Sequence, residues 1–135
     1  MTILTRLLFL SAFWVTYTFG QNAPVTVVKA IPHFEQHPVY ADGHGGMTED
    51  MAIEYRNDSD KEIVEVKFRV FLLNKGDPRT QNWYSGGVYS SQHKLAPGKK
   101  NFAHWPSYVP FGIKKMRADV IKVVFKDGST WERPN

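Results

Sequence analysis

Three histidines occur close together in one polar segment: His33, His37 and His44, with Glu35 and Asp42 between them. Imidazole and carboxylate groups are ligands that suit zinc and copper in proteins. The spacing differs from the H-E-x-x-H motif of metalloproteases, because the glutamate comes one position too late after His33. The segment therefore leaves two alternatives, a divalent metal site or a polar loop whose histidines face solvent.

A second group of candidate binding residues is aromatic and lies between positions 83 and 108. Aromatic rings exposed on a sheet stack on sugar rings or anchor a protein partner. The alternative is that they belong to the core, because a small sandwich needs large side chains between its sheets. Asn82, Gln92 and His93 are neighbours that offer hydrogen bonds to orient a ligand. The candidate residues are Trp83, Tyr84, Tyr89, Trp105 and Tyr108.

Motifs for catalysis are missing from the sequence. It contains no G-x-S-x-G nucleophile elbow, no glycine-rich phosphate loop and no cysteine. The missing cysteine also excludes a disulfide framework and a thiolate metal site. Glu49, Asp50 and Asp119 have no spacing that pairs them, although a fold can bring distant carboxylates together. We therefore expect a protein that is not an enzyme and has no cofactor.

The elements that would position these residues are β-strands. Residues 64–72 alternate between apolar and mainly charged side chains, with Val66, Phe68 and Val70 on one face. A period of two is typical of a strand with one face in a core and one in water. We expect a second strand at 49–56, paired with this one as an antiparallel hairpin through the polar turn at 57–61.

The remaining strands are expected at 25–31, 82–91, 99–105, 115–126 and 129–132. Pro32 is expected to end the first of them and to begin a long irregular loop over residues 32–48. Gly86 and Gly87 indicate either a β-bulge or a close approach of another backbone in the strand at 82–91.

The final hairpin turns at Gly128. A two-residue loop would place Trp131 opposite Val124, whereas a three-residue loop with a left-handed Gly128 would place it opposite Val123. The second arrangement puts the indole on the face shared by Val123 and Phe125, and burial there removes about 200 Å² from water. We therefore expect the three-residue loop.

About seven short strands without a helix predict an all-β fold, a single antiparallel immunoglobulin-like β-sandwich. The motifs N-x-S-x-K-x-I-x-x-V-x-F at 57–68, L-x-P-G-K at 95–99 and V-x-F-x-D-G-x-x-W at 123–131 follow one another in this order. This order resembles the small exported β-sandwich domains related to the FxLYD group, although residues 68–72 lack the Tyr-Asp ending of that motif. The resemblance implies a sandwich fold and no catalytic residues.

The first twenty residues have the pattern of a secretory signal peptide. Arg6 ends a short positive region, thirteen residues from 7 to 19 are mainly apolar, and Thr18 and Gly20 are small residues at the cleavage positions. A membrane-spanning helix needs about 20 apolar residues, which disfavours the alternative of an uncleaved anchor. We expect cleavage after Gly20, a domain at 21–135, a secreted or periplasmic location and no stable membrane span.

Charge disfavours one class of partner. Lys and Arg number 17 against 13 Asp and Glu, and the basic residues are scattered along the chain. A nucleic-acid interface needs a basic stripe, so we expect no nucleic-acid partner. The sequence therefore predicts a non-enzymatic binding module of the cell envelope whose partner is an unknown protein or an envelope glycan. Metal binding through His33, His37 and His44 is the alternative.

Overall fold

The computed structural model describes residues 22–39, 46–73, 83–107, 113 and 115–135, with the backbone alone at 35–39, 46–49, 84 and 107. The expected signal peptide, residues 1–20, lies outside this range. No helix occurs among the described residues, so none there is long and apolar enough to cross a membrane. The strands are β1 (Val25–Val39), β2 (Gly46–Asn57), β3 (Ile63–Leu73), β4 (Trp83–Ser91), β5 (Lys100–Ser107), β6 (Met116–Phe125) and β7 (Thr130–Glu132).

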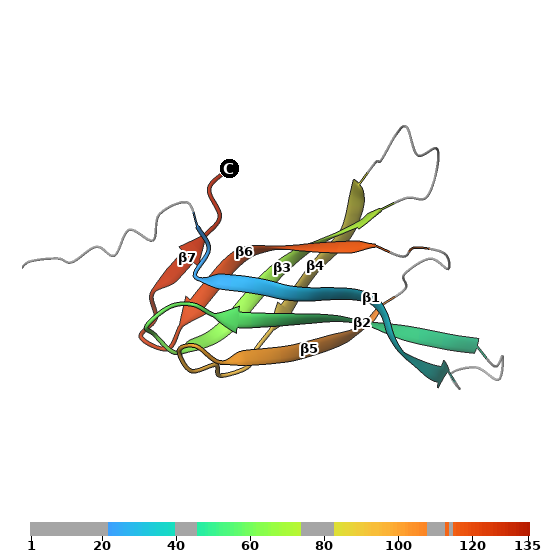
Figure 1. Cartoon of the computed structure of the whole chain (residues 1–135), viewed down its shortest axis with the longest axis horizontal. Coiled ribbons are helices and arrows are strands. Elements are labelled where there is room, and N and C mark those ends of the chain that lie inside the picture. Colours follow the sequence, from blue (N-terminus) through green and yellow to red (C-terminus); the bar gives the residue numbers. More distant parts are fainter. Residues whose placement is uncertain (1–21, 40–45, 74–82, 108–112, 114) are drawn as a thin grey trace, which may run out of the picture.

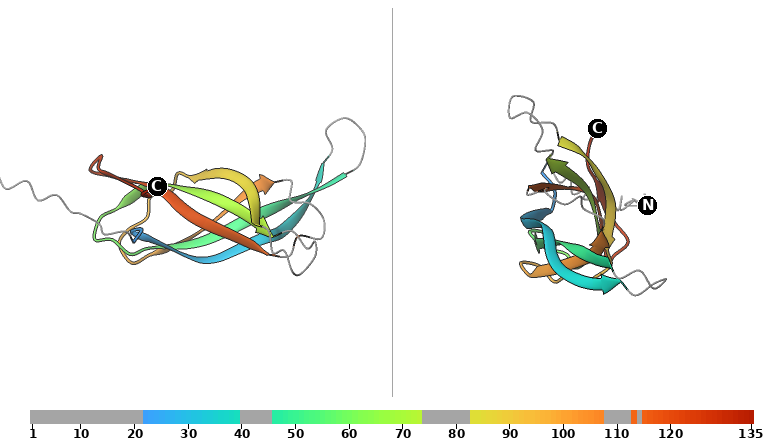
Figure 2. Two further views of the ribbon diagram at one scale, coloured as in Figure 1. Left: turned by 90° about the horizontal axis from the view of Figure 1, so that it is seen from above. Right: turned by 90° about the vertical axis from the view of Figure 1, so that its right-hand side faces the viewer.

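The strands form two antiparallel sheets that pack face to face (Figures 1 and 2). Sheet A has the order β1-β2-β5, and sheet B has the order β4-β3-β6-β7. The edge strands are therefore β1 and β5 in sheet A, and β4 and β7 in sheet B. This arrangement confirms the predicted all-β sandwich.

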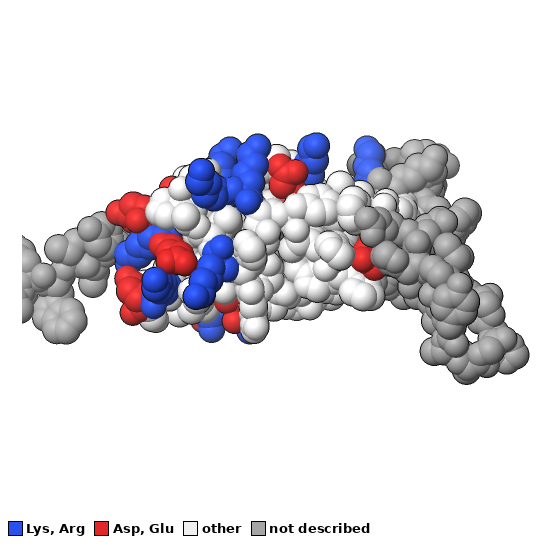
Figure 3. Space-filling model, turned by 90° about the horizontal axis from the view of Figure 1, so that it is seen from below, with Lys and Arg blue, Asp and Glu red and all other residues white. Residues whose placement is uncertain are grey.

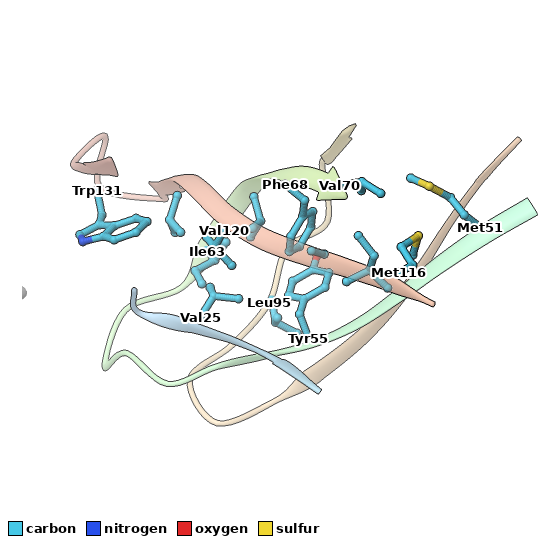
Figure 4. Close-up of a cluster of buried hydrophobic side chains, with 14 of the residues drawn as sticks. Val25, Met51, Tyr55, Ile63, Phe68, Val70, Leu95, Met116, Val120 and Trp131 are labelled. Carbon is cyan, nitrogen blue, oxygen red and sulfur yellow. The ribbon is translucent and has the colours of Figure 1, made fainter. Parts of the chain in front are cut away.

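The core lies between the two sheets and confirms the predicted faces of the long strands. Val66, Phe68 and Val70 of β3 are at most 1% exposed. From sheet A, β2 contributes Tyr55, whose ring lies 5.1 Å from the ring of Phe68 (Figure 4). Burial of such side chains contributes about 1.5–3 kcal/mol each, so facing strands of opposite sheets hold each other in place.

The expected hairpin between residues 49–56 and 64–72 is wrong, because β2 and β3 belong to different sheets. Asn57 is buried at the crossing between the sheets, and its side-chain amide donates hydrogen bonds to the carbonyl oxygens of Lys61 and Leu95. Ser59 donates to the Asn57 side-chain oxygen. These bonds fix a turn that carries the chain across the core, and the two apolar faces bury each other instead of lying in one sheet.

The expected end of the first strand at Pro32 is also wrong. β1 continues to Val39 and pairs with β2 as far as Gly46, so most of the predicted loop at 32–48 is a hairpin that extends past the other strands (Figure 1). Proline is tolerated because β1 is an edge strand, where a missing N–H need not interrupt the ladder. A register shift between Ile31 and Glu35 absorbs the irregular stretch around Pro32.

Of the two alternatives for Gly86 and Gly87, the structure has the bulge in β4. Val70 pairs with Gly87 and Phe71 pairs with Ser85, so Gly86 is the extra residue. A Cβ atom on Gly86 would lie 3.1 Å from the Cγ1 atom of Val70, which leaves no comfortable room for a side chain.

The three-residue loop of the final hairpin is confirmed as well. Trp131 pairs with Val123, and Gly128 has a φ of 85° in the left-handed region. Trp131 is buried in the core, because its partner Val123 faces the core as well.

Candidate functional site

The bulge in β4 separates aromatic residues that we grouped as one candidate binding surface from the sequence. Trp83 and Tyr89 are six residues apart, and an unbroken strand would direct both to one face. The extra residue Gly86 reverses this alternation. Trp83 therefore lies on the outer face of sheet B beside Arg117, whereas Tyr89 contacts Trp105 on the inner side.

Tyr89 and Trp105 close the side of the sandwich between β4 and β5. Their rings lie 5.8 Å apart, and Trp105 also lies 6.2 Å from the ring of the buried Phe68. The Trp105 indole N–H donates to the carbonyl oxygen of Ser90 at 3.0 Å, and the Tyr89 hydroxyl donates to the carbonyl oxygen of Gly86 at 3.1 Å. Both rings are partly buried against the core. The side chain of Tyr84 and all of Tyr108 lie outside the described residues.

Trp83 is 37% exposed and forms part of a stacked group on sheet B. The guanidinium of Arg117 lies 4.5 Å from the ring centre of Phe71 and 5.2 Å from that of Trp83. Asp119 pairs with Arg117 at 3.5 Å. Because the guanidinium stacks on the indole and its charge is paired, this group has less ring surface to offer a ligand than an unstacked tryptophan.

The predicted histidine site falls mostly outside the described side chains. His33 Nε2 donates to the carbonyl oxygen of Ile113 at 2.6 Å, so that nitrogen already has a structural partner. His37 is described through its backbone, which pairs with Thr48, and His44 is outside the described range. Among the described side chains, no three histidine or carboxylate groups lie close enough to hold a metal ion. Metal binding by this segment stays a prediction.

A different group of side chains, which the sequence did not reveal, lies on the outer face of sheet A. The ring of Phe34 from β1 meets the ring of Phe102 from β5 at 4.8 Å, nearly edge to face. It also lies 5.9 Å from the imidazole of His104. Phe34 is 37% exposed and Phe102 38% exposed. We call Phe34, Phe102 and His104 the sheet A cluster.

The central strand explains why rings from two edge strands meet. β2 lies between β1 and β5, and its Ala52 pairs with Ile31 on one side and with His104 on the other. Ala52 is fully buried although it lies on an outer face. Its short side chain leaves room for the rings of Phe34 and Phe102 to reach over β2 and contact each other.

A buried carboxylate, that of Asp50, fixes the orientation of His104, the polar member of the sheet A cluster. The Asp50 side chain is 6% exposed, and its Oδ2 atom lies 2.9 Å from Nδ1 of His104, whose side chain is 51% exposed. Burial of a carboxylate costs free energy unless the carboxylate is hydrogen-bonded. Because a carboxylate accepts, Nδ1–H donates, and Nε2 is left for other partners. The site therefore combines two phenyl faces with one oriented imidazole nitrogen.

Part of this cluster has a sequence signal. Phe102 and His104 lie two positions apart in a predicted strand, which places both on one face. Phe34 has no such signal, because its position depends on the register shift between Ile31 and Glu35. Asp50 could be recognised only once β2 and β5 were known to be neighbours.

A pocket lined by Lys61, Glu62, Lys126 and Asp127 lies at the end of the sandwich where β3 begins and β6 ends. Lys61 pairs with Asp127 at 3.0 Å, and Lys126 pairs with Glu62 at 3.4 Å. Hydrogen bonds from the Ser129 hydroxyl and backbone N–H, together with Lys61, lower the pKa of Asp127 to about 2. The charges of this pocket neutralise one another, which is typical of a stabilised turn.

Comparison with known proteins supports the fold. No family model matches the sequence, and no curated protein matches it. The chain is similar to the solved structure of a hypothetical protein from Peptoclostridium difficile 630, with a TM-score of 0.54 and 12% sequence identity over 84% of this chain and 88% of that one. A likeness at this identity shows a shared fold alone. The resemblance to the FxLYD group stays a prediction.

Proposed function

We propose that this protein is an exported, non-enzymatic binding module of the cell envelope whose binding surface is the sheet A cluster. The observation that carries the proposal is the contact between the exposed rings of Phe34 and Phe102 beside an imidazole that Asp50 holds in place. Single exposed apolar residues are ordinary on protein surfaces. Two aromatic rings in contact, next to an oriented polar group, are typical of a binding hot spot.

The geometry around His104 favours binding over catalysis. An imidazole oriented by a carboxylate becomes a general base only if a nucleophile or substrate proton lies within its reach. Within the described part of the chain, His104 bonds to the Asp50 carboxylate and no hydroxyl bonds to it. The imidazole is then best suited to give or accept one hydrogen bond that fixes the orientation of a ligand on the phenyl rings.

Screening the purified protein against a random peptide library and a glycan array tests this proposal. We expect a ligand of one class whose affinity falls about tenfold or more when Phe34→Ala and Phe102→Ala are combined, because loss of a central hot spot costs about 2 kcal/mol or more. Circular dichroism confirms that the variant is folded. Trp83→Ala is the matched control, since it removes an equally exposed ring from sheet B.

The result that contradicts the proposal is a ligand whose affinity is insensitive to the double variant. If Trp83→Ala abolishes that binding instead, the aromatic residues predicted between 83 and 108 form the surface.

A further inference from the structure

Three of the four edge strands are irregular or short, and such features block pairing with another strand. β1 contains Pro32 and Pro38 and two register shifts. β4 contains the bulge at Gly86, and its Ser90 carbonyl oxygen already accepts the Trp105 indole N–H. β7 has only three residues. These edges present no long, regular row of backbone groups.

β5 is the exception. It pairs with β2 from Lys100 to Ser107 without a register shift. No strand occupies its other side in the described part of the chain. Its one proline, Pro106, lies near the end, so residues 100–105 form a regular open edge. A regular edge with free backbone groups is a template for an added strand.

The register identifies the backbone groups that are free. Asn57 N–H donates to the carbonyl oxygen of Lys99. Asn57 and Lys99 are therefore a hydrogen-bonded pair of the β2–β5 ladder. Hydrogen-bonded and non-bonded pairs alternate in an antiparallel ladder. Phe102 and His104 therefore occupy non-bonded positions, and their N–H and C=O groups point away from β2. The same two residues carry side chains of the sheet A cluster.

Charge differs along this edge. Figure 3 views the molecule from below Figure 1, the side on which β5 lies, and few charged side chains lie in the middle of this face. Charged side chains of both signs gather at the end where β5 begins, and Lys99 and Lys100 are exposed there. Lys100 Nζ lies 3.8 Å from the Glu54 carboxylate, and an exposed ion pair of this length contributes little energy. The open edge thus has an uncharged middle and begins with two exposed lysines.

We infer that the ligand is an extended peptide segment that adds to β5 as an antiparallel strand. Its backbone pairs with Phe102 and His104, and an apolar side chain packs on the phenyl rings. Because the added strand runs opposite to β5, its C-terminal side lies beside Lys99 and Lys100 and is acidic. A second copy of this chain fits less well, since antiparallel pairing would set these lysines beside residues 105–107, which are uncharged. This inference rests on the proposed function.

The probe is an end-capped decapeptide of alternating valine and threonine that ends in two aspartates. Amide hydrogen exchange, followed residue by residue with NMR, reads the pairing directly. We expect the peptide to slow exchange at Phe102 and His104 about tenfold or more, and to leave Ala103 unchanged because its N–H already bonds to β2. A peptide of reversed sequence, with the acids at its N-terminal side, binds more weakly.

Backbone methylation of the peptide provides the matched control. Methyl groups on the nitrogens that face β5 abolish binding, whereas methyl groups on the alternate nitrogens leave it intact. In the protein, Lys99→Glu combined with Lys100→Glu weakens binding of the acidic peptide and strengthens binding of a version ending in two lysines. Neither substitution touches the core.

The outcomes separate this inference from the proposed function. A ligand that needs Phe34 and Phe102 but ignores backbone methylation, or a glycan that binds the same rings, overturns strand addition and leaves the binding surface in place. A dimer seen in sedimentation that protects Phe102 and His104 assigns the edge to a second copy and also overturns it. Ligands that are insensitive to both the rings and the edge overturn the two proposals together.

Discussion

β4 and β5 are edge strands on the same side of the sandwich, yet they end their sheets in opposite ways. β4 is interrupted by an extra residue at Gly86, and one of its carbonyl oxygens is occupied by the side chain of Trp105. β5 keeps a regular register over its whole length. Both strands carry exposed apolar side chains, Val88 on β4 and Phe102 on β5. Exposure alone therefore does not distinguish them, whereas the regularity of the backbone does.

Among the described strands, three edges are protected against pairing with another strand, and the edge of β5 is open. Unpaired edges favour aggregation, and natural sheets blunt them with bulges, prolines and short strands. Those features occur on β1, β4 and β7. The open edge of β5 lies beside the sheet A cluster, so the backbone and the side chains of one strand offer complementary contacts to the same ligand.

The largest effect on stability is expected at Phe68, a core residue that contacts both β4 and β5. Phe68 pairs with Tyr89 of β4 and its ring contacts Trp105 of β5. Phe68 is fully buried, so Phe68→Ala should lower the free energy of unfolding by about 3–5 kcal/mol. Phe102→Ala makes the same change at an exposed ring and should cost about 1 kcal/mol, the contribution of an aromatic pair. Urea unfolding of both variants measures the contrast, and equal midpoints would contradict it.

A smaller effect is expected at the bulge that interrupts β4. Gly87 has a φ of 102°, a conformation that a residue with a side chain rarely adopts. Gly87→Ala should therefore lower the free energy of unfolding by roughly 1–3 kcal/mol. Val88→Thr, at an exposed neighbour, should change it by less than about 0.5 kcal/mol. If Gly87→Ala proves neutral, the bulge is not a fixed feature and the two edges are more alike than we describe.

The smallest effect concerns the turn that leads into β7, the other edge of sheet B. The pKa of Asp127 is lowered to about 2, first by the Ser129 hydroxyl and backbone N–H and then by Lys61. Because the folded pKa lies below the ordinary value of 3.8, the contribution of Asp127 to stability is present above that value and is lost as the pH falls toward 2. An NMR titration of the carboxyl carbons measures this pKa.

Variants of its two partners check the order of these causes. Ser129→Ala should raise the pKa of Asp127 more than Lys61→Gln does, because the hydroxyl contributes the largest share. The reverse order would show that the ion pair, rather than the turn, holds this carboxylate.

Local patterns were sufficient to predict much of the fold. Alternation placed Val66, Phe68 and Val70 in the core, and turn chemistry placed Trp131 opposite Val123. The partners of β2 could not be predicted in this way. The polar turn after Asn57 looks like a hairpin turn, and only its bonds to Leu95, distant in the sequence, show that it crosses between the sheets.

The candidate site was predicted less well, because it depends on where strands shift register. An extra residue at Gly86 moved Trp83 and Tyr89 to opposite faces. The irregular stretch after Ile31 brought Phe34 over β2, although Pro32 indicated the end of the strand. Neither shift follows from residue types alone, since each is fixed by contacts with the neighbouring strand.

Amide hydrogen exchange of the free protein tests most directly whether β5 is an open edge. The N–H groups of Phe102 and His104 point away from β2, and that of Ala103 points toward it. At low protein concentration we expect rapid exchange at Phe102 and His104 and slow exchange at Ala103 between them. Slow exchange at all three residues of the monomer would contradict this account, because it would mean that the outer side of β5 is already paired.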